Sequence, residues 1–327
     1  MIDTRRTRSR SGGFVLICVL WILAILTVIT LGFGRRALLD QRAAAFSIDE
    51  MQAVCLARGA AVQGLVELEQ RRRVQESVGG WLRSRADAYS ADNGPIPEAM
   101  DVLGTGDVRE TFPGLFDVPF ENEECGYRIE DEERRLCVNH ITREVLDAIE
   151  AVDPRTRSAI LDRLRDSQTS AVPAFSVLEE FLTLDGVDDR TWRGERGRAG
   201  LRDLLTVYGD GRVNINTASE DVLTCLPGLG EDAVRDLLIY RAGADGELDT
   251  ADDRRFGNLE EIPHLTGIDP AALAPLSLYG KTDSRFFKIS GFATRRQRRI
   301  RAVCAVSCVM LDDRIAVLRW EEDTGGS

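Results

Sequence analysis

An uncharged apolar run near the N-terminus constrains this chain more than any other feature of its sequence. Between Phe14 and Phe33 stand 20 residues without a single charge. At a rise of about 1.5 Å per residue, such a helix is roughly 30 Å long, which matches the hydrocarbon core of a bilayer. Arginines flank the run on both sides, at positions 5, 6, 8, 10, 35 and 36. Because a short basic leader stays in the cytoplasm, we expect a single-pass membrane protein whose remaining residues face the other side.

This N-terminal segment has three interpretations. A secretory signal peptide needs a shorter apolar region and a small-residue cleavage site, and residues 32–36 (Gly-Phe-Gly-Arg-Arg) make a poor one. An uncleaved signal anchor is the second interpretation. The third is cleavage before the run, because a basic leader ending at Gly13 and followed by Phe14 resembles the class III signal of type IV pilins and pseudopilins. That resemblance implies that prepilin peptidase cuts between Gly13 and Phe14 and leaves the membrane helix on the mature chain.

Cys18 indicates which member of this family the chain resembles. It occupies the fifth position after the expected cut, where most pilins and pseudopilins carry Glu. A carboxylate inside lipid is costly and needs a partner, so its absence changes how a subunit enters a helical assembly. The pseudopilin that ordinarily lacks this Glu is the K component of type II secretion, general secretion pathway protein K.

The composition fits a large extracytoplasmic part and excludes several functions. The chain has 327 residues, enough for two compact units, and a net charge of −12, which argues against a general nucleic-acid binder. It has no phosphate-binding G-x-x-x-x-G-K-[ST] and no G-x-S-x-G, and we expect both histidines, His140 and His264, to be structural or solvated. We therefore predict no catalytic residue and no catalytic cofactor. Among the seven cysteines, Cys125 and Cys137 flank a predicted hairpin and are the best candidates for a disulfide.

Helical character continues beyond the apolar run. Apolar or small residues recur every three or four positions, which predicts one face of a helix packed on a sheet: Ile48, Met51, Cys55, Gly59, Val62 and Val66. The helix is expected to reach about Arg73. Residues 125–141 then alternate as in a β-hairpin, with a turn near residues 131–133.

A helical block follows from about residue 142. Asp153 and Pro154 are typical of a helix start, Ser176 with Glu179 suggests a capping box, and residues 201–207 are ambiguous between helix and strand. The most specific stretch is the segment from Val213 to Gly230, which predicts a capping box, a tight turn and two short helices, a helix-hairpin-helix motif. Its key residues are Asn214, Asn216, Thr217, Pro227, Gly228 and Gly230, with Glu220 as the partner of Thr217 in the capping box. A looser copy covers residues 259–277.

After residue 281 the alternation of strands returns, over 286–292, 300–311 and 315–320. Strands on both sides of a helical block indicate one sheet with an insertion. We therefore predict an α+β fold: a pilin-like long N-terminal helix on an antiparallel sheet, with an inserted all-helical, SAM-like domain. The expected division is leader 1–13, membrane helix 14–33, outer helix 34–76, first pilin-like part 77–141, inserted domain 142–280, C-terminal strands 281–320 and a disordered tail 321–327.

The order of these elements resembles the K pseudopilins over the leader, helix, hairpin, Val213–Ser219 segment and final strands; residues 166–198 show no family pattern. The resemblance implies a minor pseudopilin in the inner membrane with its C-terminal part in the periplasm. It implies a place at the tip of the pseudopilus, where the protein initiates assembly with the I and J minor pseudopilins and the major pseudopilin. It also implies methylation of the N-terminus of the mature chain.

The helix-hairpin-helix stretch has an alternative interpretation. It also resembles ComEA-type competence receptors, which are membrane-anchored and bind DNA, with hairpin amides and basic residues on phosphate. Between Val213 and Gly280, however, the chain has 13 acidic and 4 basic residues, a net charge of −9. We therefore favour a structural turn in a protein-binding domain and expect no nucleic-acid partner.

An acidic loop between the two helical repeats suggests calcium. Five carboxylates stand within the nine residues from Asp245 to Asp253. Calcium takes 6–8 oxygen ligands from flexible carboxylate loops, although this spacing is not that of an EF-hand. The resemblance to K pseudopilins also implies calcium in the helical domain. The predicted ligands are Asp245, Asp249, Asp252 and Asp253, and the alternative is a solvated acidic loop.

Overall fold

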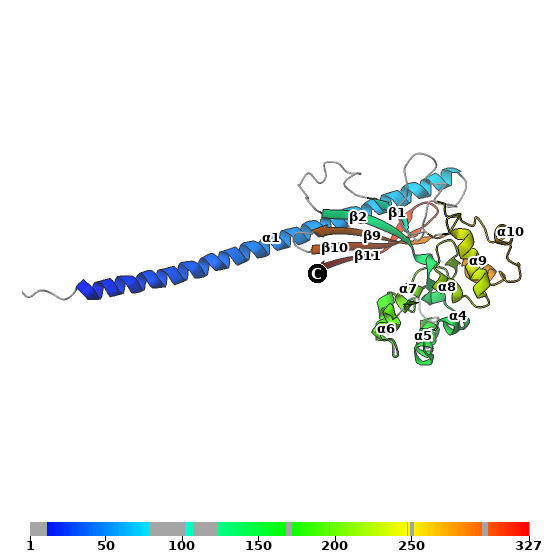
Figure 1. Ribbon diagram of the computed structural model, residues 1–327, viewed down its shortest axis with the longest axis horizontal. Coiled ribbons are helices and arrows are strands. Elements are labelled where there is room, and N and C mark those ends of the chain that lie inside the picture. The colour runs from blue at the N-terminus through cyan, green and yellow to red at the C-terminus, as the bar shows by residue number, and fades with distance from the viewer. Residues whose placement is uncertain are drawn as a thin grey trace, which may run out of the picture.

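A single long helix and an antiparallel sheet dominate the computed structural model (Figure 1). The structure describes residues 12–78, 102–106, 123–167, 172–195, 197–246, 248, 252–295 and 300–326. Helix α1 (Gly12–Val78) has 67 residues, and its N-terminal half projects far beyond the rest of the molecule. The predicted continuation of the apolar run into one helix is confirmed, with an end five residues later than expected.

The projecting half of α1 is apolar and bare. It is long and apolar enough to cross a membrane, with a mean hydropathy of 2.8 over the best window and none of that window buried. The hydroxyls of Thr27 and Thr30 donate to the carbonyls of Leu23 and Leu26, both at 2.7 Å. Because these polar groups are satisfied inside the helix, they do not oppose insertion into lipid.

The other half of α1 packs on the sheet, but through a face different from the predicted one. The buried side consists of small residues and leucines: Ala53, Leu56, Ala57, Ala60, Ala61, Gly64 and Leu68. The predicted stripe lies on the opposite side, and Met51 and Val62 are 66% and 47% exposed. Size explains the difference, since the backbone of β9 comes so close at Gly291 that it contacts Ala57 and Ala61 directly.

The sheet joins strands from both ends of the chain. Its order is β1-β2-β9-β10-β11, with every pair antiparallel. The bounds are β1 (Val102–Gly106), β2 (Glu123–Asp131), β9 (Phe286–Arg295), β10 (Ile300–Met310) and β11 (Ile315–Gly326). Strand β2 pairs with β9 along its full length, from Glu123 opposite Arg295 to Asp131 opposite Phe287. Residues 132–285 therefore stand, in the chain, between two paired strands of one sheet.

Two predictions about the sheet are wrong. The expected hairpin over residues 125–141 does not form: after Asp131 the chain leaves the sheet through the 3₁₀ turn η1 (Glu132–Arg134). Strand β3 (Leu136–Cys137) then pairs with β6 (Leu205–Thr206). Residues 321–326 of the expected disordered tail belong to β11, with Gly326 opposite Ile300. Alternation predicted a hairpin over residues 125–141, but pairing is decided by residues distant in sequence.

All seven cysteines lie in the described part of the chain as reduced thiols, Cys125 and Cys137 among them. The Cys125 thiol donates to the carbonyl of Leu56 on α1, at 3.8 Å, whereas the Cys137 thiol donates to the carbonyl of Gly209, at 3.6 Å. The proposed disulfide between these two residues is therefore absent, because the hairpin that was to bring them together does not exist.

Residues 132–285, here called the insert, lie beside the end of the sheet that is farther from the N-terminus (Figure 1). Besides η1, β3 and β6 they form η2 (Val138–His140), α4 (Arg143–Ala148), α5 (Pro154–Ser167), η3 (Leu178–Thr183), α6 (Asp189–Arg193), β4 (Gly194–Glu195), β5 (Arg198–Ala199), α7 (Leu201–Leu204), β7 (Val213–Asn214), α8 (Glu220–Thr224), α9 (Glu231–Arg241), α10 (Ile262–Thr266), α11 (Leu276–Tyr279) and β8 (Gly280–Lys281). Three two-residue strand pairings mean that the insert is not all-helical. It has its own hydrophobic cluster, which includes Phe175, Phe181 and Phe256.

Of the helix caps and helices predicted inside the insert, some are confirmed and others differ in the structure. Asp153 caps α5, since its Oδ1 accepts from the amide of Thr156 at 2.6 Å. The expected capping box at residues 176–179 uses Glu180 instead, which accepts from the amide of Ser176 at 2.9 Å. The ambiguous segment 201–207 contains both α7 and β6. In the looser copy predicted over residues 259–277, the second helix is short, because residues 270–275 form turns and only Leu276–Tyr279 is helical.

The close approach of α1 to β9 gives a test with a matched control. We expect Gly291→Ala to destabilise the fold by about 1–3 kcal/mol, since the new methyl group meets backbone atoms that have no room to move. Gly59→Ala places its methyl group in open space on the same helix, and we expect it to stabilise by about 0.5–1 kcal/mol. Chemical unfolding of the full chain in detergent, followed by circular dichroism, measures both. Equal effects of the two substitutions contradict this packing.

Candidate functional site

The projecting end of α1 is the first candidate site. Gly13 and Phe14, the predicted cleavage pair, lie in the first turn of α1, and Phe14 is 72% exposed. Trp21 is 67% exposed. Other large apolar side chains along this half of the helix are exposed as well. The predicted leader up to residue 11 lies outside the described residues. An apolar helix of this length is stable in water only when lipid or another protein covers it.

A second candidate is a buried polar junction between sheet and insert. Asp131, at the end of β2, is 1% exposed. Its Oδ2 accepts from Asn214 Nδ2 at 3.0 Å, Thr217 Oγ1 at 2.6 Å and Ser284 Oγ at 2.6 Å. Its Oδ1 accepts from the amide of Glu133 at 2.8 Å. Burial raises the pKa of Asp131 to about 6, although the hydrogen bonds from Ser284 and Thr217 act in the opposite direction.

The next two carboxylates extend this junction. Glu133 Oε1 lies 2.5 Å from Lys281 Nζ, with side chains 1% and 8% exposed, and Glu133 Oε2 accepts from the amide of Arg285 at 2.7 Å. Glu132 accepts from Thr206 Oγ1 at 2.6 Å. Three consecutive carboxylates thus hold three different parts of the insert against the end of β2. Because each buried charge is paired or hydrogen-bonded, the junction fixes the position of the insert.

The Val213–Ser219 segment belongs to this junction. Asn216 donates through Nδ2 to the carbonyls of Phe256 and Thr282, both at 2.9 Å, and its Oδ1 accepts from the amide of Phe256. Asn214 Oδ1 accepts from the amide of Asn216 at 3.0 Å. The asparagine side chains of this segment therefore join it to the backbone at Phe256 and Thr282 within the insert. The expected capping role of Thr217 is wrong, since Ser219 caps α8.

The predicted hairpin turn joins α8 to α9. Position 228 requires glycine because its φ is +82°. Gly230 has an ordinary φ of −73°, and a Cβ there would stand in open space. The turn also contains Pro227. Helix α9 starts with Glu231 and Asp232, so negative charge already lies at the helix end that favours anions. A nucleic-acid phosphate is repelled at this position.

The acidic loop is described only in part. Asp249 lies outside the described residues, whereas Asp245, Asp252 and Asp253 are described. Asp252 Oδ2 accepts from the amides of Ala244 and Asp245, at 2.5 and 3.1 Å. Within the described part of the chain, no group of three or more His, Cys, Asp or Glu side chains is placed to hold a metal ion. The four aspartates therefore stay a predicted calcium site, which the described geometry neither assembles nor excludes.

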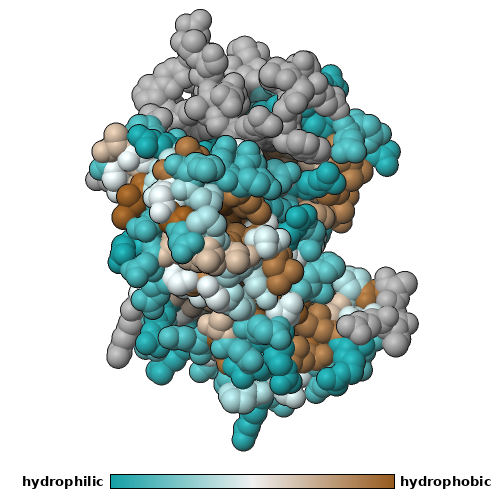
Figure 2. Space-filling view, turned by 90° about the vertical axis from the view of Figure 1, so that its right-hand side faces the viewer, coloured by the Kyte–Doolittle hydropathy of each residue, from teal (hydrophilic) through white to brown (hydrophobic). Residues whose placement is uncertain are grey.

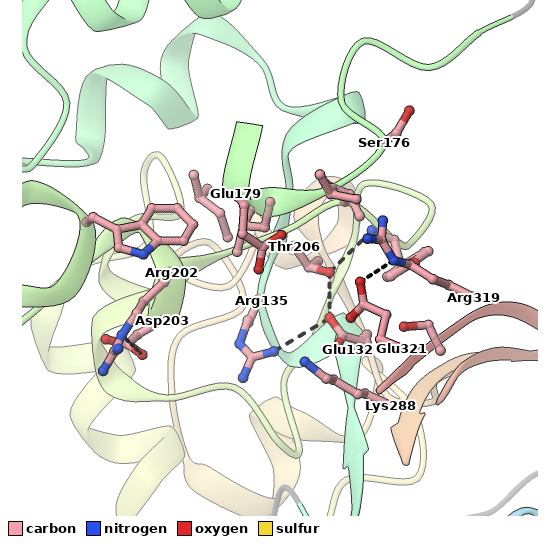
Figure 3. A pocket seen from close by; sticks show the side chains of 17 residues that line it. Glu132, Arg135, Ser176, Glu179, Arg202, Asp203, Thr206, Lys288, Arg319 and Glu321 are labelled. Atoms are coloured by element: carbon pink, nitrogen blue, oxygen red, sulfur yellow. Dashed lines mark hydrogen bonds and ion pairs between the residues drawn. The ribbon is translucent and has the colours of Figure 1, made fainter. Parts of the chain in front are cut away.

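A polar cavity of about 330 Å³ separates the sheet from the insert (Figure 3). Lys288, Ser307, Arg319 and Glu321 line it from the sheet, and residues from Glu132 to Tyr208 line it from the insert. Its charges are mixed: Arg135 lies 3.5 Å from Glu132, and Arg319 pairs with Glu321. Opposite charges in such close pairs select neither an anion nor a cation. No sequence pattern predicted this cavity, because segments that are distant in the sequence line it.

These observations define a class of fold. A long N-terminal helix that is bare along its first half and packs its second half on an antiparallel sheet is pilin-like. Among solved structures, the chain is similar to one in the crystal structure of the GspK–GspI–GspJ complex from the enterotoxigenic Escherichia coli type 2 secretion system. The TM-score is 0.49 at 14% identity, over 87% of this chain and all of that one. No protein-family model and no curated protein match the sequence.

The raised pKa of Asp131 predicts a pH dependence of stability. Between about pH 4 and 6 the folded chain keeps a proton on Asp131 that the unfolded chain has released. The free energy of unfolding should therefore fall as pH rises through this range, by on the order of 3 kcal/mol. We expect Asp131→Asn to remove this slope in denaturant unfolding at pH 4, 5, 6 and 7.

Glu69→Gln is the matched control for this measurement. A hydrogen bond from Arg72 lowers the pKa of Glu69 to about 2, so its contribution is lost only as pH falls below about 4.5. The variant should keep the slope between pH 4.5 and 6. An unchanged slope in Asp131→Asn shows that another group titrates there.

The predicted calcium site has a simple test. If the acidic loop binds calcium, millimolar calcium raises the thermal midpoint of the full chain, and saturation at 100 times Kd stabilises by about 2.7 kcal/mol. Asp252→Asn combined with Asp253→Asn should abolish the shift. Asp313→Asn, an exposed carboxylate in the β10–β11 turn, should leave it unchanged. Absence of a shift with the unaltered protein rules the site out.

Proposed function

We propose that this protein is a minor pseudopilin of a type II secretion system, the K component. The observation that carries the proposal is the division of α1 into a bare apolar half and a half packed on the sheet. The first half has the length of a bilayer core, and the second joins the helix rigidly to the folded part. A helix built in this way anchors a subunit in the membrane and can then pack among other helices of the same kind.

The N-terminal residues support the same proposal. The chain is cleaved between Gly13 and Phe14, and Phe14–Phe33 then spans the inner membrane with the folded part in the periplasm. Cys18 stands where other pilins and pseudopilins carry Glu. A subunit without this carboxylate has no charge in the membrane that needs a partner on a neighbouring subunit. This favours a position at the end of the fibre, where no neighbour lies above.

The insert supplies the proposed role at the tip. It lies beside the end of the sheet that is farther from the membrane helix (Figure 1). We assign residues 142–280, which contain the helix-turn-helix of α8 and α9, to a domain that caps the fibre. The partners are the I and J minor pseudopilins and the major pseudopilin, which agrees with the composition of the GspK–GspI–GspJ complex named above. The protein's contribution is binding and positioning.

The decisive experiment is N-terminal sequencing and intact mass of the full chain, extracted from membranes with and without prepilin peptidase. We expect a mature chain that starts at Phe14 only when the peptidase is present. A chain that always starts at Met1, or that is cut after Gly34, would falsify the pseudopilin assignment. The membrane-anchored DNA receptor then becomes the leading candidate, despite the acidic start of α9.

A further inference from the structure

The end of the molecule where the insert lies has a mixed surface. Figure 2 shows its hydrophobic residues in separate areas among hydrophilic ones. Hydrophobicity alone therefore singles out no binding site on this face. The polar cavity of about 330 Å³ between sheet and insert is different, because its shape and its charges both indicate a ligand.

This cavity lies in a cleft that is closed on one side and open on the other. On the closed side the chain itself joins the sheet to the insert, since β2 continues directly into η1 and β9 follows shortly after β8. The open side ends at β11, which pairs with β10 alone among the described strands. A chain that enters the cleft beside β11 therefore meets the connections between sheet and insert and has to end there.

Lys288 forms the sheet wall near the closed end. It stands directly opposite Ser307 on β10, which in turn stands opposite Arg319 on β11. Its neighbours Phe287 and Ile289 are buried against α1. Because side chains alternate along a strand, Lys288 lies on the other face of the sheet, towards the insert. The row from Arg319 to Lys288 thus leads from the open side of the cleft to its closed end.

The charges that line the cavity leave two groups unpaired. Six of the eight charged side chains form ion pairs with one another: Arg135 with Glu132, Arg202 with Asp203, and Arg319 with Glu321. Lys288 and Glu179 form no ion pair with any residue that the structure describes (Figure 3). Lys288 belongs to the sheet and Glu179 to the insert. A ligand with a negative group at Lys288 and a positive group at Glu179 therefore complements the cavity.

Arg135 adds a donor beside Lys288. Its Nε is buried and has no hydrogen-bond acceptor in the described part of the chain. Buried donors are almost always paired, since an unpaired one destabilises the fold. Figure 3 shows the ends of Lys288 and Arg135 directed toward one another. Two such cationic groups favour an anion between them, and a carboxylate can accept from both.

A mainly apolar hollow of about 410 Å³ continues the cavity on its open side. The two spaces share four lining residues: Ser176, Val207, Tyr208 and Arg319. Phe175 and Leu318 line the hollow alone, and Leu318 is 46% exposed. Leu318 is the extra residue of a β-bulge, because the register of β11 shifts between the partners of Ser307 and Cys308. Bulges re-aim a side chain in this way beside many binding sites.

We propose that this cleft binds the C-terminal end of a polypeptide chain. The α-carboxylate lies between Lys288 and Arg135 at the closed end, a basic side chain just before it pairs with Glu179, and an apolar residue further back contacts Leu318. Capture of a terminal carboxylate is a recurrent mode of peptide recognition. None of these residues belongs to the membrane helix, so the inference is independent of the proposed function.

The test uses the full chain, immobilised in detergent micelles, and two libraries of acetylated hexapeptides of random sequence. The libraries differ only in the last group, which is a free carboxylate in one and a carboxamide in the other. We expect the carboxylate library to be retained at least about tenfold better, because hydrogen bonds to a charged group are lost in the carboxamide. Sequencing of the retained peptides should show Lys or Arg enriched in the last positions.

Two substitutions separate the two ends of the ligand. Lys288→Gln should lose the preference for the carboxylate, and Lys288→Arg should keep it. Glu179→Gln should lose only the enrichment of basic residues. Arg301→Gln is the matched control and should bind like the unaltered chain, since Arg301 is an exposed cation of β10 that does not line the cavity.

Each outcome decides the proposal. Retention of neither library, or equal retention of both, overturns it. A carboxylate preference that survives Lys288→Gln overturns it as well. Retention of carboxamide peptides with an internal Asp or Glu also contradicts it, because the cleft then accepts the middle of an acidic chain. N-terminal sequencing of the same preparation reports separately on the proposed function, since a start at Phe14 does not depend on peptide binding.

Discussion

The backbone of β9 at Gly291 lies against the alanines of α1, and this contact decides which side of the helix faces the sheet. Direct contact with Ala57 and Ala61 leaves no room for a side chain at Gly291. Gly64, on the same side of α1, repeats the pattern, since a Cβ there would lie 2.6 Å from Ile289 Cγ2. Because the sheet accepts only small residues here, it selects the alanine side of the helix and leaves the larger apolar side chains outside.

The second constraint is electrostatic and lies at the other end of the sheet. The insert leaves the sheet after Asp131 and returns before Phe286, so both of its ends lie next to each other. Asp131 and Glu133 bind the returning segment through Ser284, Lys281 and the amide of Arg285. Buried carboxylates need such partners, and the partners are available only when the insert is folded and docked. Local folding of the insert and its placement on the sheet are thus coupled.

The sequence predicted the parts of this fold that depend on local pattern. The length of α1, the three C-terminal strands and the turn at Gly228 all follow from periodicity or backbone preference. Hydrophobic periodicity could not choose between the two sides of α1, since both are apolar and residue size decides between them. It also could not show that Thr217 bonds to Asp131, 86 positions away, instead of capping the nearby helix. The cavity around Lys288 and the polar junction could not be predicted for the same reason, because segments far apart in the sequence build both.

A rigid connection between helix and sheet has a consequence for how the folded part sits above a membrane. The Arg58–Glu322 pair and the small-residue contact hold α1 at several points along the sheet, so these two elements move as one body. The helix itself is weakest at the end of the apolar run, where Gly32 and Gly34 each lower helix stability by about 1 kcal/mol relative to alanine, and a Cβ at either position would meet nothing within 4 Å. Any tilt of the folded part relative to the membrane is therefore concentrated at these two glycines.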